Sequence, residues 1–396
     1  MSGSLRMYLS NHEHNRLVLR QAQDERVPNR STQIRMRLSL AVLGVGAQCS
    51  IGMSAPAVAA AAAGAIKGFR FDEHIRSGRT GAQITCAWLE TLPEHWMAID
   101  RMQALAIAAA SEATDAIDAM DETDVTDVIP GLAGVPLPVL LALPPPRPGL
   151  DEEAGMRLAR DIIDGLPIPV EKRSCAAVLE GHGGGVKLLV AAEQLLTAGR
   201  APAVLVGGVE SYRDVDTLRF IERTGRLRTE DDALGWIPGE GACFLLLTTI
   251  EGAERLGVSP VVRVDAAATS EEPAPWYSGK PTIGTGLTRA LRDVFETEDG
   301  ERAEVYCDLN GEPWRADEWG YAYLRTSAQY TEPLAINHPA DCWGDLGAAS
   351  GPMLISFAVQ QMMRQRSASS RAVIWTASDT LALRSACVLT ENRASS

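Results

Sequence analysis

The run LLTAGRAPAVLVGGVES, from Leu195 to Ser211, joins the end of an apolar helix, a turn and a buried strand. Its strand part, Ala203 to Val209, is almost entirely apolar, which is typical of a strand covered on both faces. Gly207 and Gly208 follow, and their missing Cβ atoms permit a tight turn and a close approach of neighbouring backbone. An ordinary strand-to-loop glycine pair is the alternative. The run therefore predicts one β/α unit of a layered α/β protein.

The same alternation of apolar strands and helical patterns extends along the chain in both directions. Strands are predicted at 38–46, 135–143, 173–179, 203–209, 241–248, 261–267, 303–309, 372–376 and 384–389. Helices are predicted from about 54, at 97–119, 152–164, 186–198, 250–256 and 286–295, and from about 348. The β/α order starts again after residue 256, so we expect two similar halves, 36–255 and 256–396. The polar residues 1–35 lack a sustained apolar period and are expected to be a disordered extension.

Composition excludes several classes of function. A formal net charge of -14 and a pI of about 5.0 argue against a nucleic-acid or anionic-membrane partner. Hydrophobic residues at 46% and charged residues at 22% are typical of a globular protein with a large core. No apolar run reaches the roughly 18 residues that a membrane span requires, and the N-terminus has no signal-peptide core. We therefore expect a cytoplasmic protein.

The seven cysteines are scattered, and none forms a CxxC pair. This spacing suggests neither a zinc site nor a disulfide framework. Most of the cysteines lie in apolar runs, where reduced thiols act as small core residues. We expect no metal and no cofactor.

Three further segments share the glycine-rich character of the opening run. They are VLGVG with SIG at 42–52, GWIPGEGA at 235–242, and LGAA at 346–349. In this order and at these spacings, the four segments resemble the β-ketoacyl synthases of the thiolase-like superfamily. The resemblance implies a duplicated, five-layer αβαβα fold over residues 38 to 390.

These glycines allow two other interpretations. Gly44 and Gly46 after a strand invite a dinucleotide-binding interpretation, but the third glycine and the later acidic residue of that fingerprint are missing. Gly239 and Gly241 around Glu240 could form a simple hairpin. Neither alternative explains the order of all four segments.

The resemblance also implies a Cys-His-His catalytic set, which this chain lacks. The thiolate nucleophile of such enzymes heads a helix, about 25 residues before the glycine pair, and His182 stands there in GHGGG. Cys175 lies seven residues earlier in a strand and is interpreted as a core thiol. The chain therefore resembles a degenerate synthase and is not expected to be a working condensing enzyme.

The two histidine positions are also replaced. Asn310 occupies the first, and asparagine cannot exchange a proton near neutral pH. Gly344 or Asp345 occupies the second, according to the alignment of one loop. His338 is too far away unless this loop is rebuilt, and the closing GFGGTN loop is replaced by residues 378–385.

The sequence leaves three roles open for His182. It is a structural histidine bonded to backbone and kept neutral by the helix N-terminus, a ligand-binding group, or a base or nucleophile in altered chemistry. The string HGGG also occurs in lipase oxyanion loops, but the GxSxG elbow of those enzymes is missing. The candidates for lining a ligand pocket are His182, Gly183, Gly207, Gly208, Trp236 and Asn310.

Two remaining features are ambiguous. Trp314 and Trp319 bracket Asp317 and Glu318, either in an exposed recognition loop or in a half-buried helix. The acidic stretch 115–127 reads as a solvated helix face and loop.

The leading functional expectation is a non-catalytic synthase-like protein in a bacterial multiprotein system. It would act as scaffold, adaptor or ligand-holding partner, with type VI secretion as one setting. The first alternative is a subunit resembling a chain-length factor, and the second is a residual acyltransferase or hydrolase that uses His182 or Cys175. The expected partners are a second copy or a synthase-like protein docked along the strand 175–179, and an acyl carrier protein or secretion-system protein.

Overall fold

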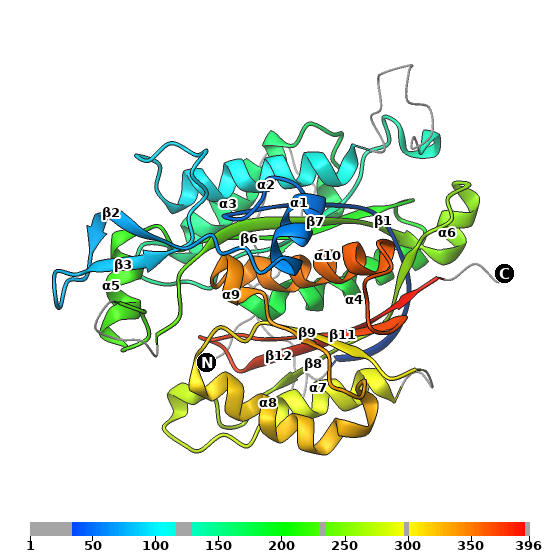
Figure 1. Cartoon of the computed structure of the whole chain (residues 1–396). Helices are drawn as coiled ribbons and strands as arrows, with labels where there is room; N and C mark the ends of the chain where they lie inside the picture. The colour runs from blue at the N-terminus through cyan, green and yellow to red at the C-terminus, as the bar shows by residue number, and fades with distance from the viewer. Residues whose placement is uncertain (1–33, 116–128, 230–234, 297–300, 393–396) are drawn as a thin grey trace, which may run out of the picture.

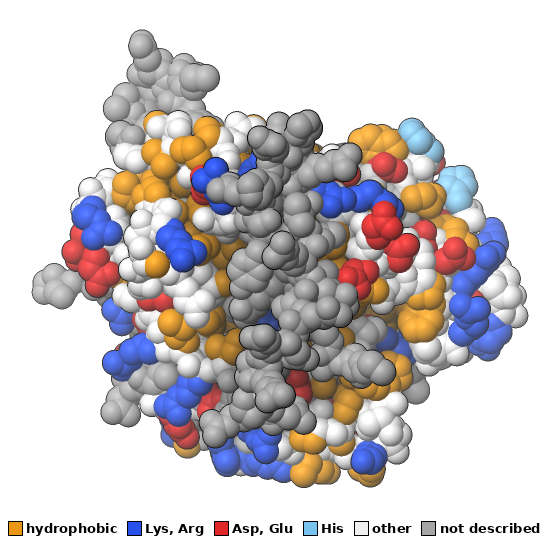
Figure 2. All heavy atoms as spheres, turned by 180° about the vertical axis from the view of Figure 1, so that it is seen from behind, with side chains coloured by type: hydrophobic (Ala, Val, Ile, Leu, Met, Phe, Trp, Pro, Cys, Tyr) orange, Lys and Arg blue, Asp and Glu red, His pale blue; other side chains and the backbone are white. Residues whose placement is uncertain are grey.

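The computed structural model describes residues 34–115, 129–229, 235–296 and 301–392. Residues 1–33 of the predicted extension and residues 116–128 of the acidic stretch lie outside this described part. Figure 2 shows basic and acidic side chains interspersed on one face of the molecule. None of the helices in the described ranges has the length and apolar character that crossing a bilayer requires.

One mixed ten-stranded sheet forms the backbone of the fold, in the order β10-β9-β11-β12-β8-β1-β7-β6-β4-β5. Its strands are β1 (Ile34–Cys49), β4 (Val139–Ala142), β5 (Ala176–Val178), β6 (Val204–Ser211), β7 (Glu240–Thr249), β8 (Val262–Glu271), β9 (Glu304–Cys307), β10 (Ile336–Asn337), β11 (Arg371–Ala377) and β12 (Leu383–Glu391). A separate hairpin consists of β2 (Arg70–Arg76) and β3 (Gln83–Cys86).

The strand order repeats. From one edge to the middle, the first half of the sheet has the order β5-β4-β6-β7-β1, so its third strand along the chain lies at the edge and its first in the middle. From the other edge, the second half has the order β10-β9-β11-β12-β8, which is the same pattern. The two first strands, β1 and β8, pair antiparallel and join the halves. The predicted duplicated α/β fold is therefore confirmed, whereas the boundary at residue 256 stays a prediction.

The helices form three layers around the two halves of the sheet (Figure 1). They are α1 (Ala55–Ala63), α2 (Ala98–Thr114), α3 (Glu152–Gly165), α4 (Gly184–Thr197), α5 (Val215–Arg223), α6 (Ile250–Arg255), α7 (Thr285–Phe295), α8 (Pro313–Thr326), α9 (Ala340–Trp343) and α10 (Ser350–Met363). Helices α2 and α3 cover one outer face, α7 and α8 cover the other, and α4 and α10 lie between the half-sheets. Their order gives the predicted five layers.

The two central helices begin in the same way. Each follows a 3-10 turn that starts at a glycine with positive φ, Gly181 (62°) before α4 and Gly347 (46°) before α10. Gly185 of α4 lies against the Pro352 ring of α10, where an added Cβ would be 2.4 Å from the ring. The N-terminal ends of α4 and α10 therefore meet in the middle of the molecule, one from each half.

Two of the glycine-rich segments lie inside strands and pack against helices and rings. Gly44 and Gly46 lie inside β1, where an added Cβ would be 2.3 and 2.0 Å from carbonyl oxygens of α2. They serve close helix packing, with no turn for a phosphate. Gly207 and Gly208 likewise lie within β6 and not after it, facing the Phe244 ring and the Ala348 carbonyl.

The segment around Glu240 starts β7 and is not a hairpin. The buried Glu240 carboxylate accepts hydrogen bonds from Nε and Nη2 of Arg101 and from the Leu89 N–H. Arg101 lies on α2, so this ion pair fastens an outer helix to the sheet. The tryptophans belong to helix α8, in which Trp319 stacks on Trp375 at 5.5 Å, so the half-buried helix is the correct reading.

Candidate functional site

His182 lies in the 3-10 turn Gly181–Gly183, where strand β5 leads into central helix α4. Its side chain is 1% exposed. The Nε2 atom is 2.9 Å from Oδ1 and 3.1 Å from Oδ2 of Asp345, and Nδ1 is 3.8 Å from Oδ1 of Asp379. The expected backbone partners of the ring are therefore wrong: its partners are carboxylates.

Asp345 collects donors from several parts of the fold. Its Oδ1 accepts hydrogen bonds from the Tyr212 hydroxyl (3.1 Å) and the Gly347 N–H (2.8 Å), and Oδ2 accepts one from Asn310 Nδ2 (2.6 Å). The backbone is held as well, because the Asp345 N–H donates to the Ile237 carbonyl at 2.8 Å. The carboxylate position is thus determined by five other residues.

His182, Asp345 and Asp379 form the core of a buried cluster of polar side chains, and two buried arginines extend it. Nη1 of Arg315 donates to Asp308 Oδ2 at 2.9 Å, and its Nε lies 3.2 Å from Glu312 Oε2. Arg226 bridges Glu312 (2.6 Å) and Asp379 (2.9 Å). Each carboxylate of this buried cluster therefore has a cationic neighbour, as burial of charge requires.

The electrostatics favour the ionised pair. Burial alone would lower the pKa of His182, but the Asp345 carboxylate raises it above its ordinary value, against opposition from Arg315. Burial would raise the pKa of Asp345, yet His182 and Arg315 hold it well below its usual range. The prediction that the helix end lowers the pKa of His182 and keeps it neutral is therefore wrong in direction: the Asp345 carboxylate, 2.9 Å from Nε2, favours the protonated ring.

The pKa values of two neighbouring groups, Asp379 and Tyr212, are shifted as well. Burial opposes ionisation of Asp379, but Arg226 and His182 lower its pKa nonetheless. Burial and the nearby Asp345 raise the pKa of Tyr212 well above its ordinary value, so its hydroxyl remains a donor. Arg315 Nη2 lies 3.2 Å from His182 Nε2 and 3.9 Å from Asp345 Oδ2, so both groups share this carboxylate as a neighbour.

The structure thus brings together His182, Asn310 and Asp345, the three positions at which the resemblance implied reacting groups. It leaves Cys175 in the core at the start of β5, where the sulfur accepts from the Val139 N–H at 3.3 Å. His338 is partly exposed and pairs with Asp341 at 3.2 Å, outside the cluster.

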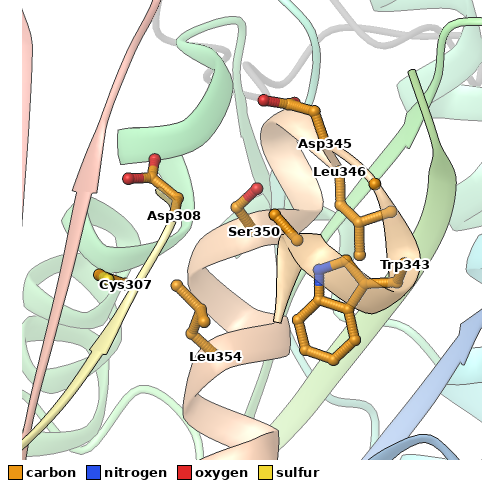
Figure 3. Close-up of a pocket in the computed structure, with 9 residues that line it drawn as sticks. Cys307, Asp308, Trp343, Asp345, Leu346, Ser350 and Leu354 are labelled. Carbon is orange, nitrogen blue, oxygen red and sulfur yellow. The ribbon is translucent and has the colours of Figure 1, made fainter. Parts of the chain in front are cut away.

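The predicted ligand-pocket residues mostly pack against protein. Gly183 lies against the Ser385 and Leu383 side chains, and Trp236 lies edge-on to Tyr212 with a centroid distance of 4.8 Å. Figure 3 shows a cavity beside the cluster, and its volume is only about 10 Å³. It is lined by Cys307, Asp308, Ala340, Trp343, Gly344, Asp345, Leu346, Ser350 and Leu354. None of the six pocket candidates is among these residues.

No thiol is available as a nucleophile. All seven cysteines are unpaired and buried. Burial raises the pKa of Cys175 to about 11 and that of Cys86 to about 12. Because the thiolate is the reactive form, these groups are inert near neutral pH.

Arg226, Arg315, Tyr212 and Asp379 were not predicted as site residues. Arg226 follows α5, Tyr212 follows β6, and Asp379 follows β11, so only the tertiary fold brings them to His182. The one usable signal was Asp379 itself, a carboxylate in the segment that replaces the closing glycine loop. A group of three His, Cys, Asp or Glu side chains suited to a metal ion is not found in the described ranges.

The comparisons with known proteins agree with this geometry. No family model matches the chain. The "Actinorhodin polyketide putative beta-ketoacyl synthase 2" of Streptomyces coelicolor is 27% identical over 202 residues, which are 47% of this chain and 48% of that protein. The chain thus spans about half the length of the curated relative that it matches.

Solved ketosynthases share the fold at low identity. The ishigamide ketosynthase/chain length factor has a TM-score of 0.63 at 18% identity, over 89% of this chain and 99% of that chain. A type II polyketide acyl-carrier protein in complex with its ketosynthase (AntDE:AntF) has a TM-score of 0.69 at 15% identity, covering 90% of this chain and 100% of that one. A bacillaene synthase ketosynthase from Bacillus subtilis also reaches 0.69, at 14% identity over 89% and 72%. The chain therefore has the fold of the solved ketosynthases, and about half of it is similar in sequence to a β-ketoacyl synthase.

Proposed function

We propose that this chain is a non-condensing, ketosynthase-like subunit that serves as a structural partner in a protein complex. The observation that carries the proposal is the buried His182–Asp345 ion pair, at the place where the resemblance implies a thiolate and a histidine. Both side chains are almost inaccessible to solvent, at 1% and 3%. The polar groups there bind one another.

Acyl transfer and hydrolysis fit this geometry poorly. A general base needs a ring nitrogen that can reach the substrate's proton, whereas Nε2 of His182 is engaged by Asp345 and Nδ1 is buried. Substrate pockets have volumes of roughly 300–1,000 Å³. The cavity beside the cluster measures about 10 Å³.

The partner is proposed to be a synthase-like chain. Strand β5 is the last strand of the sheet, and no strand in the described residues pairs with its outer edge. An edge strand of this kind offers free N–H and C=O groups to another chain. The similarity to a chain whose name pairs a ketosynthase with a chain length factor favours a heterodimer, as in the chain-length-factor alternative.

An adaptor role in a type VI secretion system is compatible with the same fold. Affinity purification of the full chain from its native host separates the two settings. Recovery of an active synthase supports the chain-length-factor role, and recovery of secretion components supports the adaptor role.

The first prediction concerns the thiols. We expect a cerulenin-like epoxide to leave every cysteine of the folded protein unmodified, because all seven are buried. The same reagent in guanidinium should modify all seven, which controls for its reactivity. Intact-mass and peptide mass spectrometry measure both results. Selective modification of folded Cys175 would show a working thiolate and refute the proposal.

The second prediction concerns the ion pair. Asp345→Ala leaves His182 and Arg315 without their shared carboxylate, so the free energy of unfolding should fall by roughly 3–5 kcal/mol. The control is Asp341→Ala in the solvent-exposed pair with His338, which should cost no more than about 1 kcal/mol. Urea denaturation followed by circular dichroism measures both. Asp345→Asn, which keeps the shape of the side chain, provides a folded variant if the alanine variant does not fold. Equal losses for the two pairs would contradict a structural role.

The third prediction is a pH dependence. Because folding raises the pKa of His182, its stabilising contribution is full below the ordinary value of about 6.5 and is lost as pH rises through the folded value. Asp345 and Asp379 have lowered pKa values, so their contributions are lost on the acid side, as pH falls. The urea midpoint should therefore fall on going from pH 6 to pH 9. His182→Gln should abolish most of this decline, and His338→Gln should preserve it. An unchanged profile in His182→Gln would show that other groups cause it.

The fourth prediction concerns assembly through β5. Ala176→Lys places a charge on this edge strand and should convert the dimer with the partner, or with a second copy, to monomers. Ile336→Lys on β10, the strand at the opposite end of the sheet, is the matched control and should leave the dimer intact. Light scattering after size exclusion measures the mass, and circular dichroism verifies the fold. Dimers that survive Ala176→Lys would place the interface elsewhere.

A further inference from the structure

A small, partly open cavity lies beside the buried cluster and has no part in the proposed function. Its volume, about 10 Å³, is that of roughly one water-sized sphere. Asp308 follows β9, Asp345 precedes α10, and Ser350 is the first residue of α10. Figure 3 shows these three polar side chains around the space, with Leu354 and Trp343 closing its apolar side.

The Asp308 carboxyl is only half satisfied. Its Oδ2 accepts hydrogen bonds from Arg315 Nη1 and from the Ala377 N–H, both at 2.9 Å. Its Oδ1 is buried and has no hydrogen-bond partner in the described residues, although the side chain lines the cavity. Asp308 as a whole is 6% exposed. An orphaned oxygen of this kind costs stability unless a guest binds it.

The charges around the cavity indicate a neutral guest. Four buried carboxyl groups, Asp308, Glu312, Asp345 and Asp379, face three cationic groups, His182, Arg226 and Arg315. The Arg315 guanidinium already lies on Oδ2 of Asp308, and burial raises the pKa of this carboxyl. No group of three His, Cys, Asp or Glu side chains suited to a metal ion lies in the described ranges, so a neutral guest fits the cavity better than a cation.

We propose that this cavity binds a single water molecule, held by Oδ1 of Asp308 and the hydroxyl of Ser350 beside Asp345. The water would complete the hydrogen bonding of the cluster from the side opposite His182. Buried waters typically make about three hydrogen bonds to protein groups that lack other partners. The inference is independent of catalysis, so it stands or falls separately from the proposed function.

A crystal structure at atomic resolution tests the site directly. We expect one spherical density peak at roughly 2.7–3.2 Å from Asp308 Oδ1 and from Ser350 Oγ. Crystals soaked in rubidium chloride should show no anomalous signal there. A rubidium peak would identify a cation site, and an empty cavity would show that Asp308 is satisfied in another way. Either result overturns the proposal.

Variants give a second test in solution. Asp308→Asn keeps a neutral polar group in place, so the water peak should persist, whereas a site for a cation would lose its charged ligand. Ser350→Ala removes one partner and should reduce by about one the number of long-lived waters counted by oxygen-17 relaxation dispersion. Ser356→Ala, another buried serine of α10, is the control and should leave that number unchanged. An unchanged number in Ser350→Ala would refute the assignment.

Discussion

The carboxylate of Asp345 is the constraint on which the centre of this molecule depends. A buried carboxylate is stable only where charge and hydrogen bonds replace its lost water. Here the replacement comes from separate parts of the chain: the imidazolium of His182, the Tyr212 hydroxyl, the Asn310 amide and the Gly347 N–H. Because these donors belong to both halves of the sheet, the same interactions that satisfy the carboxylate also connect the halves.

This constraint links the three residues that stand where the resemblance implies a cysteine and two histidines. A carboxylate at position 345 needs a cation beside it, which an imidazole at 182 supplies and a neutral thiol does not. Asn310 adds a donor that remains a donor at any pH, because an amide does not titrate. The three residues therefore form one interacting unit, and the replacement of any one would leave a buried group unsatisfied.

Much of the fold could be predicted because apolar periodicity is local. Nine strands of the sheet and helices α1 to α4, α6, α7 and α10 lie close to their predicted positions. Strand β10, helices α5 and α9 and the hairpin β2–β3, with polar residues at most of its positions, were missed, and α8 was one of two alternatives. Glycine anchors also located positions 182, 310 and 345. Arg226, Arg315 and Asp379 could not be found in this way, since charges distant in sequence meet only after folding. The predicted lowering of the His182 pKa was wrong for the same reason: the helix end was considered without the carboxylate opposite, which raises this pKa.

The two helix ends bear on which residue of the central pair carries the negative charge. Asp345 accepts from Gly347 in the turn that opens α10, so its negative charge lies at the positive end of a helix dipole. His182 lies at the corresponding end of α4, which disfavours its positive charge. The Asp345 carboxylate raises the pKa of His182 despite that penalty and despite Arg315, whose guanidinium also pairs with Asp308 and Glu312. A neutral residue at 345 would leave the imidazole facing two positive helix ends and an arginine. His182 would then be expected to lose its proton, and the connection between the two halves of the fold would lose its charge.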